Sequence, residues 1–268
     1  MSLRHRLEVA SQQMLDMFFA IVPRPRPELC VLKNCKIVSH RGEHDNRRIL
    51  ENTFEAFDCV EQAGVWGIEF DVRWTKDIQP LVIHDSSTGR VFGENLKIEH
   101  HTAQQIRQQI PLIPTLQEVV ERYAGKMHLM VELKPDELGQ VELKSRRLQE
   151  IFKSCRAGVD YHFIALQLEL FDVVQFVGDS ACVPVAELNI KSFSQETLQR
   201  PFAGLSGQYL LLHQRMLKFH QARHQKIGTG FAASRFCFYR ELNRGVDWIF
   251  TNHALKLRAI QQQLLRDG

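Results

Sequence analysis

Short apolar segments alternate with amphipathic segments along most of this chain, and this alternation restricts its fold more than any other feature. Short apolar runs between turn residues predict strands, and apolar residues at helical spacing predict the helices between them. Strands are expected at residues 36–39, 66–74, 127–134, 162–168, 183–188, 209–212, 226–231 and 246–250. Strands that alternate with helices in this way indicate a parallel sheet covered by helices.

The number of strand–helix units points to a closed barrel. About eight units in roughly 230 residues are typical of a (β/α)8 barrel, whose active site collects at the C-terminal ends of the strands. We therefore expect an α/β fold: a (β/α)8 TIM barrel over residues 36–268, preceded by an N-terminal helix and proline-rich linker over residues 1–35. The alternative is an open doubly wound sheet. That fold normally carries a glycine-rich phosphate-binding fingerprint after its first strand, and none follows residues 36–39 here.

The bulk composition is that of a soluble globular chain, with 268 residues, 44% hydrophobic and 24% charged. A net charge of +3 is too small a basic excess to indicate nucleic-acid binding, although it is compatible with an anionic substrate. The six cysteines include no CxxC pair. They predict reduced thiols in a cytoplasmic protein, not a disulfide framework or a zinc site.

The N-terminal region contains an apolar run at residues 14–22 that ends at Pro23. Asp16 interrupts this run and no small-residue cleavage site follows it, so a signal peptide is not expected. The run is also shorter than the roughly 18 apolar residues that a membrane span needs. We expect a helix that packs on the barrel, with contact to a membrane surface as the alternative.

Residues 66–85 carry two carboxylates on one face of a strand. Glu69 and Asp71 alternate with apolar neighbours, so both should point the same way, roughly 7 Å apart. Two buried carboxylates need a compensating charge, and a hard divalent cation with oxygen ligands supplies it. The alternative is a surface strand whose polar face is simply solvated. After a turn, the apolar run 80–83 ends at His84 and Asp85.

Two helix starts are indicated by capping-box patterns. Asn52 with Glu55 predicts one start, and Thr115 with Glu118 predicts another. The second helix is expected to bury Leu116, Val119, Val120 and Tyr123.

Further polar residues lie at or near the ends of early strands: His40, Arg41, His84, Glu132 and Lys134. In a barrel they would meet Glu69 and Asp71 in one mouth. The three carboxylates would hold Mg²⁺ or Ca²⁺, and Arg41 and Lys134 would neutralise phosphate charge. His40 and His84 would act as base and acid. Each residue alone has a structural explanation, such as a strand-end histidine bonded to backbone, but together they favour a phosphodiester site.

With these residues in place, the chain resembles the glycerophosphodiester phosphodiesterase family over roughly residues 36–255. The matching motifs are His40-Arg41-Gly42, Glu51-Asn52-Thr53, Glu69-x-Asp71 with Thr75-Lys76-Asp77, His84-Asp85, Ile113-Pro114-Thr115-Leu116, Glu132-x-Lys134 and Gly245-Val246-Asp247 running to Thr251.

The resemblance implies a (β/α)8 barrel that cleaves a glycerophosphodiester, a small-molecule substrate, to glycerol 3-phosphate and an alcohol with one divalent cation. It implies acid/base roles for His40 and His84, and metal binding by Glu69, Asp71 and Glu132. It also implies substrate or phosphate contacts for Arg41, Lys134 and Glu51. The leaving alcohol, the native metal and the oligomeric state are left open.

Several positions depart from the family pattern. The segment between Gly42 and Glu51 is long and adds Arg47 and Arg48, which are candidates to reach substrate. Ile78 stands where the family usually has glycine; because a β-branched residue at positive φ is costly, we expect this turn to differ. Leu168-Glu169, residues 228–231 and Asn252 also differ from the usual motifs, which leaves the leaving group undefined but retains every metal ligand and both histidines.

Three other functions stay open. One is a phosphodiesterase that acts on lysophospholipids at a membrane surface through the N-terminal helix. Another is a non-catalytic barrel that binds phosphodiesters, and the last is a different metal-dependent hydrolase with the same fold.

Overall fold

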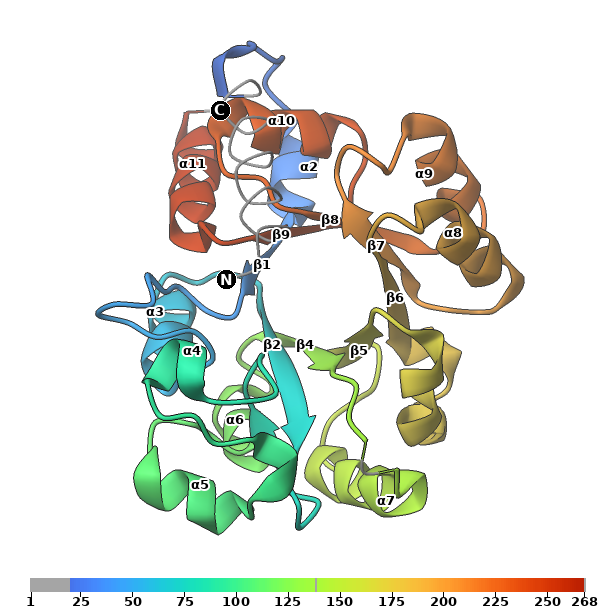
Figure 1. Cartoon of the computed structure of the whole chain (residues 1–268). Coiled ribbons are helices and arrows are strands. Elements are labelled where there is room, and N and C mark those ends of the chain that lie inside the picture. Colours follow the sequence, from blue (N-terminus) through green and yellow to red (C-terminus); the bar gives the residue numbers. More distant parts are fainter. Residues whose placement is uncertain (1–19, 138, 268) are drawn as a thin grey trace.

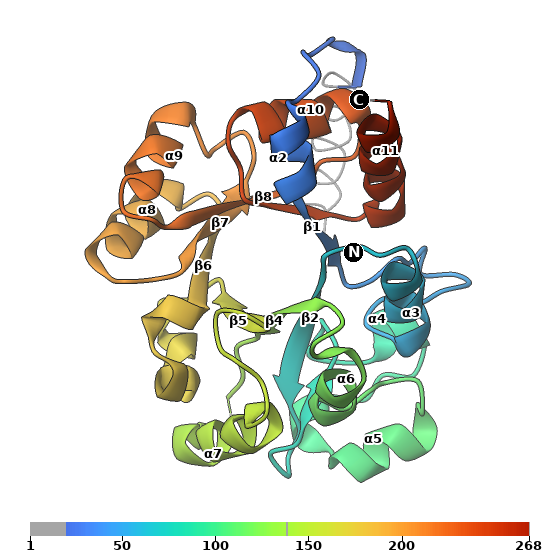
Figure 2. The ribbon, with the colours of Figure 1, turned by 180° about the vertical axis from the view of Figure 1, so that it is seen from behind.

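The computed structural model describes residues 20–137 and 139–267, and within them the strands form one closed barrel (Figures 1 and 2). The parallel strands are β1 (Lys36–His40), β2 (Gly67–Trp74), β4 (His128–Leu133), β5 (Tyr161–Ala165), β6 (Cys182–Ala186), β7 (Gly204–Gln208), β8 (Lys226–Gly230) and β9 (Trp248–Thr251). Each pairs with the next, and β1 pairs with both β2 and β9, which closes the ring. Strand β3 (Pro80–Val82) adds an antiparallel hairpin to β2. The (β/α)8 prediction is confirmed.

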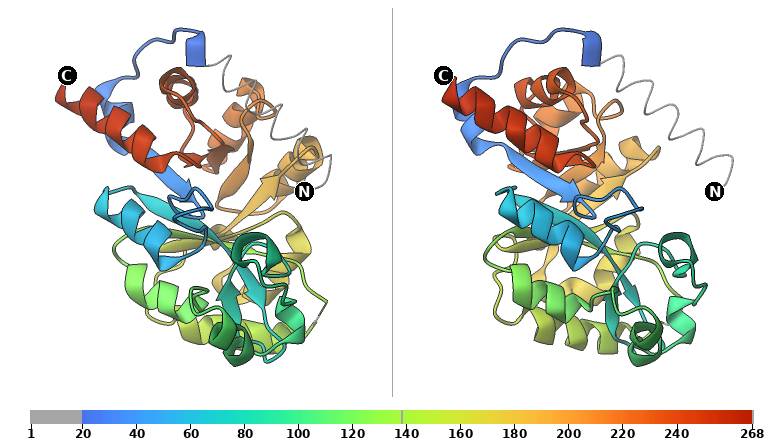
Figure 3. Two further views of the ribbon diagram at one scale, coloured as in Figure 1. Left: turned by 60° about the vertical axis from the view of Figure 1, so that its left-hand side comes forward. Right: turned by 90° about the vertical axis from the view of Figure 1, so that its left-hand side faces the viewer.

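Helices surround the strands, as the side views show (Figure 3). They are α2 (Leu29–Asn34), α3 (Phe54–Gln62), α4 (Gly89–Phe92), α5 (Ala103–Gln109), α6 (Leu116–Tyr123), α7 (Val141–Phe152), α8 (Ile190–Gln199), α9 (Gln214–Gln221), α10 (Arg235–Asn243) and α11 (Ala254–Arg266). Short 3₁₀ helices are η1 (Ile98–His100), η2 (Leu168–Val177) and η3 (Asp179–Ala181). The predicted capping box of α6 is present, with Thr115 accepting from the Glu118 amide. The four side chains expected to be buried on α6 are buried.

Strand alternation separates two environments. Ile68, Phe70 and Val72 of β2 belong to the large core between barrel and helices, whereas Glu69 and Asp71 face the barrel interior and are buried. The solvated surface strand considered above is therefore excluded. Below the carboxylates, the interior is filled by a separate apolar cluster of Val38, Met130, Ile164, Val183, Trp248 and Phe250. The polar site therefore lies directly above a layer of apolar side chains.

The prediction of one strand was wrong. Residues 209–212 form a turn, not a strand, and β7 precedes them at Gly204–Gln208. The true strand contains two glycines and little apolar surface. Gly204 is required because a Cβ there would lie 2.1 Å from the carbonyl oxygen of Lys226 on β8. The apolar Tyr209 and Leu212 are buried all the same, which explains the misleading pattern.

Two local expectations need correction. Thr53, not Asn52, caps α3, with its side chain accepting from the Ala56 amide. Ile78 adopts a positive φ of 54°, the conformation that its β-branched side chain was expected to disfavour. Thr75 supports the turn at Ile78 by accepting from the amides of Ile78 and Gln79 through its carbonyl and hydroxyl oxygens. Ile78 also packs against the core, so burial and hydrogen bonds offset the backbone strain.

The segment before β1 is attached to the C-terminal helices. Asn243 of α10 donates to the Pro25 carbonyl at 2.9 Å, and Gln261 of α11 donates to the Leu32 carbonyl at 2.7 Å. In Figures 1 and 2, α2 lies beside α10 and α11. The helix expected at residues 14–22 falls almost wholly outside the described residues. Within the described part of the chain, no helix is long and apolar enough to cross a membrane.

Candidate active site

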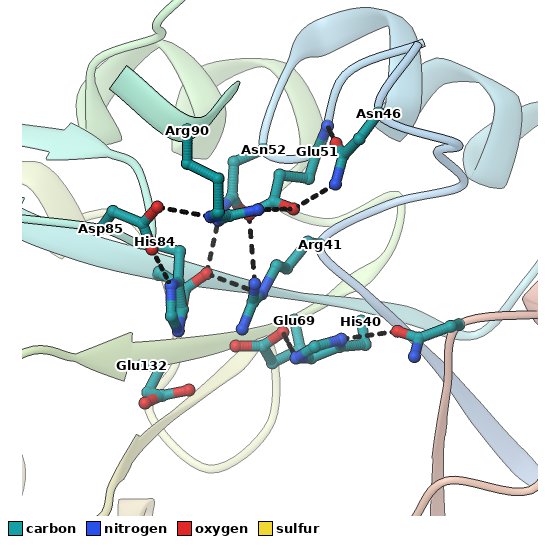
Figure 4. Close-up of polar contacts among 12 residues, drawn as sticks. His40, Arg41, Asn46, Glu51, Asn52, Glu69, His84, Asp85, Arg90 and Glu132 are labelled. Carbon is teal, nitrogen blue, oxygen red and sulfur yellow. Dashed lines mark hydrogen bonds and ion pairs between the residues drawn. The ribbon is translucent and has the colours of Figure 1, made fainter. Parts of the chain in front are cut away.

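The residues predicted to form a site meet at the C-terminal ends of the first barrel strands (Figure 4). His40 ends β1, Glu69 and Asp71 lie on β2, and Glu132 lies on β4. The β2–β4 register sets Asp71 directly beside Glu132. Parallel strands end at the same edge, so residues far apart in sequence become neighbours.

Three carboxylates form a compact cluster. One oxygen each from Glu69, Asp71 and Glu132 lie within 4.8 Å of one another, and all three side chains are buried. Neither oxygen of Glu69, which is 1% exposed, has a hydrogen-bond donor among the described residues. Burial and the charges of Asp71 and Glu132 raise the pKa of Glu69 well above its usual value. Such an unpartnered carboxylate fits a site that could hold a metal ion.

Two cations flank the carboxylates. Lys134 lies 2.9 Å from Asp71 Oδ1 and also pairs with Glu132, and Arg41 Nε lies 3.1 Å from Asp71 Oδ2 without the alignment of a hydrogen bond. Burial would raise the pKa of Asp71, but the charges of Lys134 and Arg41 outweigh it and hold that pKa well below its usual range. Asp71 is therefore the ionised centre of the cluster.

The segment 41–52 folds back over the site and has a residue with left-handed backbone at each end. Arg41 has φ 60° and Asn52 has φ 58°, and the Asn52 amide donates to the Arg41 carbonyl at 3.0 Å. This conformation directs the Asn52 side chain onto Asp71 Oδ2 at 2.8 Å. Gly42 allows the close approach, since a Cβ there would lie 2.7 Å from the Ala56 side chain.

His40 is held in one orientation. Its Nδ1 lies 2.7 Å from Asn252 Oδ1, and because an amide oxygen only accepts, Nδ1 carries the proton. Nε2 is left as the acceptor and lies 3.8 Å from Glu69. Burial and the Arg41 charge lower the pKa of His40 to about 3, so the imidazole is neutral at pH 7. The ring of Phe231 packs against it at a centroid distance of 4.7 Å.

His84 is oriented from the other side of the site. Its Nδ1 lies 2.6 Å from Asp85 Oδ1, which leaves Nε2 to exchange a proton. Arg90 binds the second Asp85 oxygen through Nε and binds Glu51 through both terminal nitrogens, at 2.6 and 3.1 Å. Arg73 fixes the backbone here, donating to the carbonyls of His84 and Pro135.

Glu51 connects the cations rather than standing alone. It accepts from Arg41 at 3.1 Å, from Arg90, and from Asn46 at 2.6 Å. Figure 4 shows these contacts as one network that runs from Asp85 to Arg41. A carboxylate so engaged holds the arginines in place and would repel a phosphate, so its geometry suits positioning of the arginines; the substrate contact expected of Glu51 stays a prediction.

The structure thus gathers all eight predicted site residues into one region. It also adds Arg90, Asn52, Asn252 and Phe231, which sequence reasoning did not assign to the site. Arg90 gave no signal, since it lies on the four-residue helix α4 outside every recognised motif. Asn252 could have been suspected from its place after the final barrel strand. Arg47 and Arg48 are exposed, and their amides bind Asp45 Oδ1 at 2.8 Å.

Comparison with known proteins gives a family match. Residues 40–164 match the sequence model of the "Glycerophosphoryl diester phosphodiesterase family", a span that contains all eight predicted site residues. A glycerophosphodiester phosphodiesterase from Caldanaerobacter subterraneus is 33% identical over 110 residues, which are 37% of this chain and 44% of that protein. Glycerophosphodiester phosphodiesterase 1 of Rattus norvegicus is 29% identical over 161 residues, 53% of this chain and 46% of the relative. The chain spans about half the length of the curated relatives it matches.

Solved structures share the fold. A glycerophosphodiester phosphodiesterase from Thermotoga maritima superposes with a TM-score of 0.70 at 24% identity, covering 84% of this chain and 98% of that one. A phosphodiesterase from Oleispira antarctica, solved with the product sn-glycerol-3-phosphate, gives 0.72 at 20% identity, with 87% and 97% covered. At such identities the likeness establishes the (β/α)8 architecture.

Proposed function

We propose that this chain, whose residues 40–164 match the model of the glycerophosphoryl diester phosphodiesterase family, hydrolyses a glycerophosphodiester to glycerol 3-phosphate and an alcohol. The observation that carries the proposal is the buried cluster of Glu69, Asp71 and Glu132 between two histidines with fixed ring orientations. A folded protein has no structural need for that arrangement.

Charge balance supports a phosphodiester as the substrate. Three carboxylates against Arg41 and Lys134 leave the cluster with one excess negative charge when all are ionised. A divalent cation would turn this into one positive charge, which matches the single negative charge of a phosphodiester. Glu69, Asp71 and Glu132 would hold the cation, Mg²⁺ or Ca²⁺, which when bound supplies Lewis-acid polarisation of a phosphoryl oxygen.

The histidines suit the two proton transfers. Neutral His40, with Nε2 as an acceptor, would take the proton of the attacking glycerol hydroxyl as the new P–O bond forms. His84, held by Asp85, would donate a proton to the oxygen of the leaving alcohol as its P–O bond breaks. Water would then open the resulting cyclic phosphate to give glycerol 3-phosphate. Arg41 and Lys134 would bind the phosphate, and Glu51 and Arg90 would keep Arg41 in place.

The direct test is release of glycerol 3-phosphate from glycerophosphocholine and glycerophosphoethanolamine. Activity is expected to vanish in EDTA and to return with Mg²⁺ or Ca²⁺. A Glu132→Gln variant that folds should stay inactive at any metal concentration. Undiminished release in EDTA, or a fully active Glu132→Gln variant, would contradict the proposal.

A lysophospholipid substrate is the second candidate, and two exposed apolar side chains favour it. Leu188, directly after β6 at the site end of the barrel, is 80% exposed, and Leu112, in the segment between β3 and α6, is 58% exposed. Apolar side chains beside a site suit an acyl chain at a membrane surface. Leu188→Asp should then lower turnover of lysophosphatidylcholine but not of glycerophosphocholine; equal effects on both would reject this candidate.

We also place the protein in the cytoplasm. All six cysteines, which lie in the described residues, are free thiols, as expected of a reducing compartment. Fractionation of cells that make the full chain would test this.

A further inference from the structure

The barrel has a cavity at the end opposite to the candidate active site. Its volume is about 600 Å³. Lys36, His128, Lys226 and Trp248, which line it, are the first residues of β1, β4, β8 and β9, whereas the candidate active site lies at the strands' C-terminal ends. The apolar cluster of the barrel interior separates the two. This cavity, which we call the basal cavity, is therefore a distinct place in the fold.

The wall of the basal cavity carries positive charge only. Among the described residues that line it there is no Asp or Glu, and its basic residues are Lys36, Arg200, Arg223, Lys226, His128, His162 and His224. Arg200 pairs with Asp179 at 2.6 Å and Lys226 with Asp247 at 3.2 Å, both carboxylates outside the lining. Lys36 and Arg223 form no ion pair within the described chain. Burial and the Lys226 charge lower the pKa of Lys36, a repulsion that a bound anion would relieve.

Two buried side chains offer hydrogen bonds at the cavity. His128 donates from Nδ1 to the Val159 carbonyl at 2.9 Å, so its Nε2 accepts from His162 Nδ1 at 2.8 Å. This relay leaves His162 Nε2 as a hydrogen-bond acceptor for a donor group of a ligand. Trp248 is 1% exposed, and its Nε1 has no acceptor among the described residues. Because buried polar groups are normally hydrogen-bonded, this indole N–H would be satisfied by an oxygen of a ligand.

Aromatic rings form another part of the cavity lining. Trp66 stacks on His128 at a centroid distance of 4.3 Å and an interplanar angle of 12°. Lys36 Nζ lies 5.1 Å from the centroid of Trp66, and Phe202 adds a further ring to the lining. A volume of about 600 Å³ exceeds what one inorganic anion needs and falls in the range of small-molecule sites.

We propose that the basal cavity binds a phosphomonoester, with its phosphate between Lys36, Arg223 and Lys226 and its organic part against Trp66. Lys36 and Arg223 have no ion pair within the described chain, and Lys226 has only its contact with Asp247. Three such cations suit a dianion better than a single carboxylate. The proposal does not depend on the chemistry at the other end of the barrel.

Tryptophan emission offers a direct readout, because Trp66 and Trp248 are two of the three tryptophans in the chain. The full-length protein in EDTA would be titrated with inorganic phosphate and with phenyl phosphate at constant ionic strength. We expect a saturable change with both, and severalfold tighter binding of phenyl phosphate. Lys36→Met/Arg223→Met should weaken both at least tenfold. Arg223→Met alone, at an exposed position, should weaken them measurably if the double variant does not fold.

Two controls separate this site from others. Lys218→Met removes an exposed charge from α9 outside the cavity and should leave both affinities unchanged. Arg41→Met removes a cation of the candidate active site and should leave the emission change intact. An emission change without saturation, equal affinity for the two probes, unchanged binding in the Lys36 and Arg223 variants, or loss of binding in Arg41→Met would each overturn the proposal.

Discussion

At the residue scale, the site depends on side chains whose proton positions are fixed by neighbours. Asn252 determines which nitrogen of His40 carries the proton, and Asp85 does the same for His84. Neither neighbour would touch the reacting atoms. Their contribution is the orientation of the imidazoles, because a neutral histidine whose proton lies on Nε2 cannot accept another proton at that nitrogen.

His84→Ala should lower kcat for glycerophosphodiester cleavage by about 10²–10⁴-fold, the usual contribution of a positioned acid or base. His84 is partly exposed, so the melting temperature should change little. The matched control is His100→Ala, which removes a histidine that is 58% exposed and should leave kcat unchanged. Steady-state assays and thermal melts test both; a His84→Ala enzyme with near-normal kcat would remove this residue from the mechanism.

Glu51 gives a prediction for pH dependence. Burial would raise its pKa, but hydrogen bonds from Arg90 and the charge of Arg41 lower it to about 2, against 4.5 as its ordinary value. A lowered carboxyl pKa stabilises the fold fully above the unfolded pKa, and this stability is lost as the pH falls toward 2. The shift corresponds to about 3 kcal/mol as an upper bound.

Glu51→Gln should therefore destabilise the protein at pH 7, and the difference from the unaltered protein should shrink between pH 4.5 and pH 2. Urea unfolding at several pH values measures this. Glu121→Gln, at an exposed position on α6, should show no such trend. A constant difference across the whole range would mean that Glu51 acts by packing alone.

At the element scale, close strand approach matters as much as hydrophobic pattern. Strand β7 has glycine at positions 204 and 207. A Cβ at 204 would lie 2.1 Å from the Lys226 carbonyl oxygen, and one at 207 would lie 3.0 Å from the Ala186 carbonyl oxygen. The turn at Ile78 shows the converse: hydrogen bonds from the Ile78 and Gln79 amides to Thr75, together with core contacts, hold a β-branched residue at positive φ. In both places surrounding structure overrides local preference.

Gly204→Ala should destabilise the barrel strongly, by about 3 kcal/mol or more, because the clash is with the Lys226 backbone and no side chain can move aside. Ser206→Ala on the same strand, which only removes atoms, should cost much less. Chemical denaturation of the two variants provides the comparison. Similar stabilities would show that β7 and β8 can separate more easily than the register indicates.

At the scale of the whole molecule, barrel closure assembles the site. Because β1 pairs with both β2 and β9, Asn252 from the end of the chain reaches His40 from its beginning, 212 positions away. The apolar side chains under Glu69 and Asp71 keep water away from one side of the carboxylates. An ion bound to these carboxylates would therefore stabilise the fold as a whole.

Mg²⁺ or Ca²⁺ should accordingly raise the melting temperature, by the equivalent of about 2.7 kcal/mol when the ion exceeds its Kd a hundredfold. Glu132→Gln removes one carboxylate and should abolish most of this increase. Differential scanning calorimetry in EDTA and in each metal tests it. An identical response of Glu132→Gln and the unaltered protein would place the ion elsewhere.

The sequence by itself determined the barrel, the polarity of its strand ends and the identity of the carboxylates and histidines. These properties follow from local periodicity and from the rule that parallel strands end together, so no knowledge of distant contacts is needed. The same holds for the α6 cap, where Thr115 and Glu118 are three residues apart.

Only the tertiary structure decided the roles of Arg90, Asn252 and Glu51, the left-handed Ile78 and the position of β7. Each depends on a partner remote in the chain or on backbone distance, as with Arg90 and Glu51, 39 positions apart, or Gly204 against Lys226. The basal cavity belongs to the same class, because its lining comes from the first residues of four strands and from loops that meet only when the barrel closes.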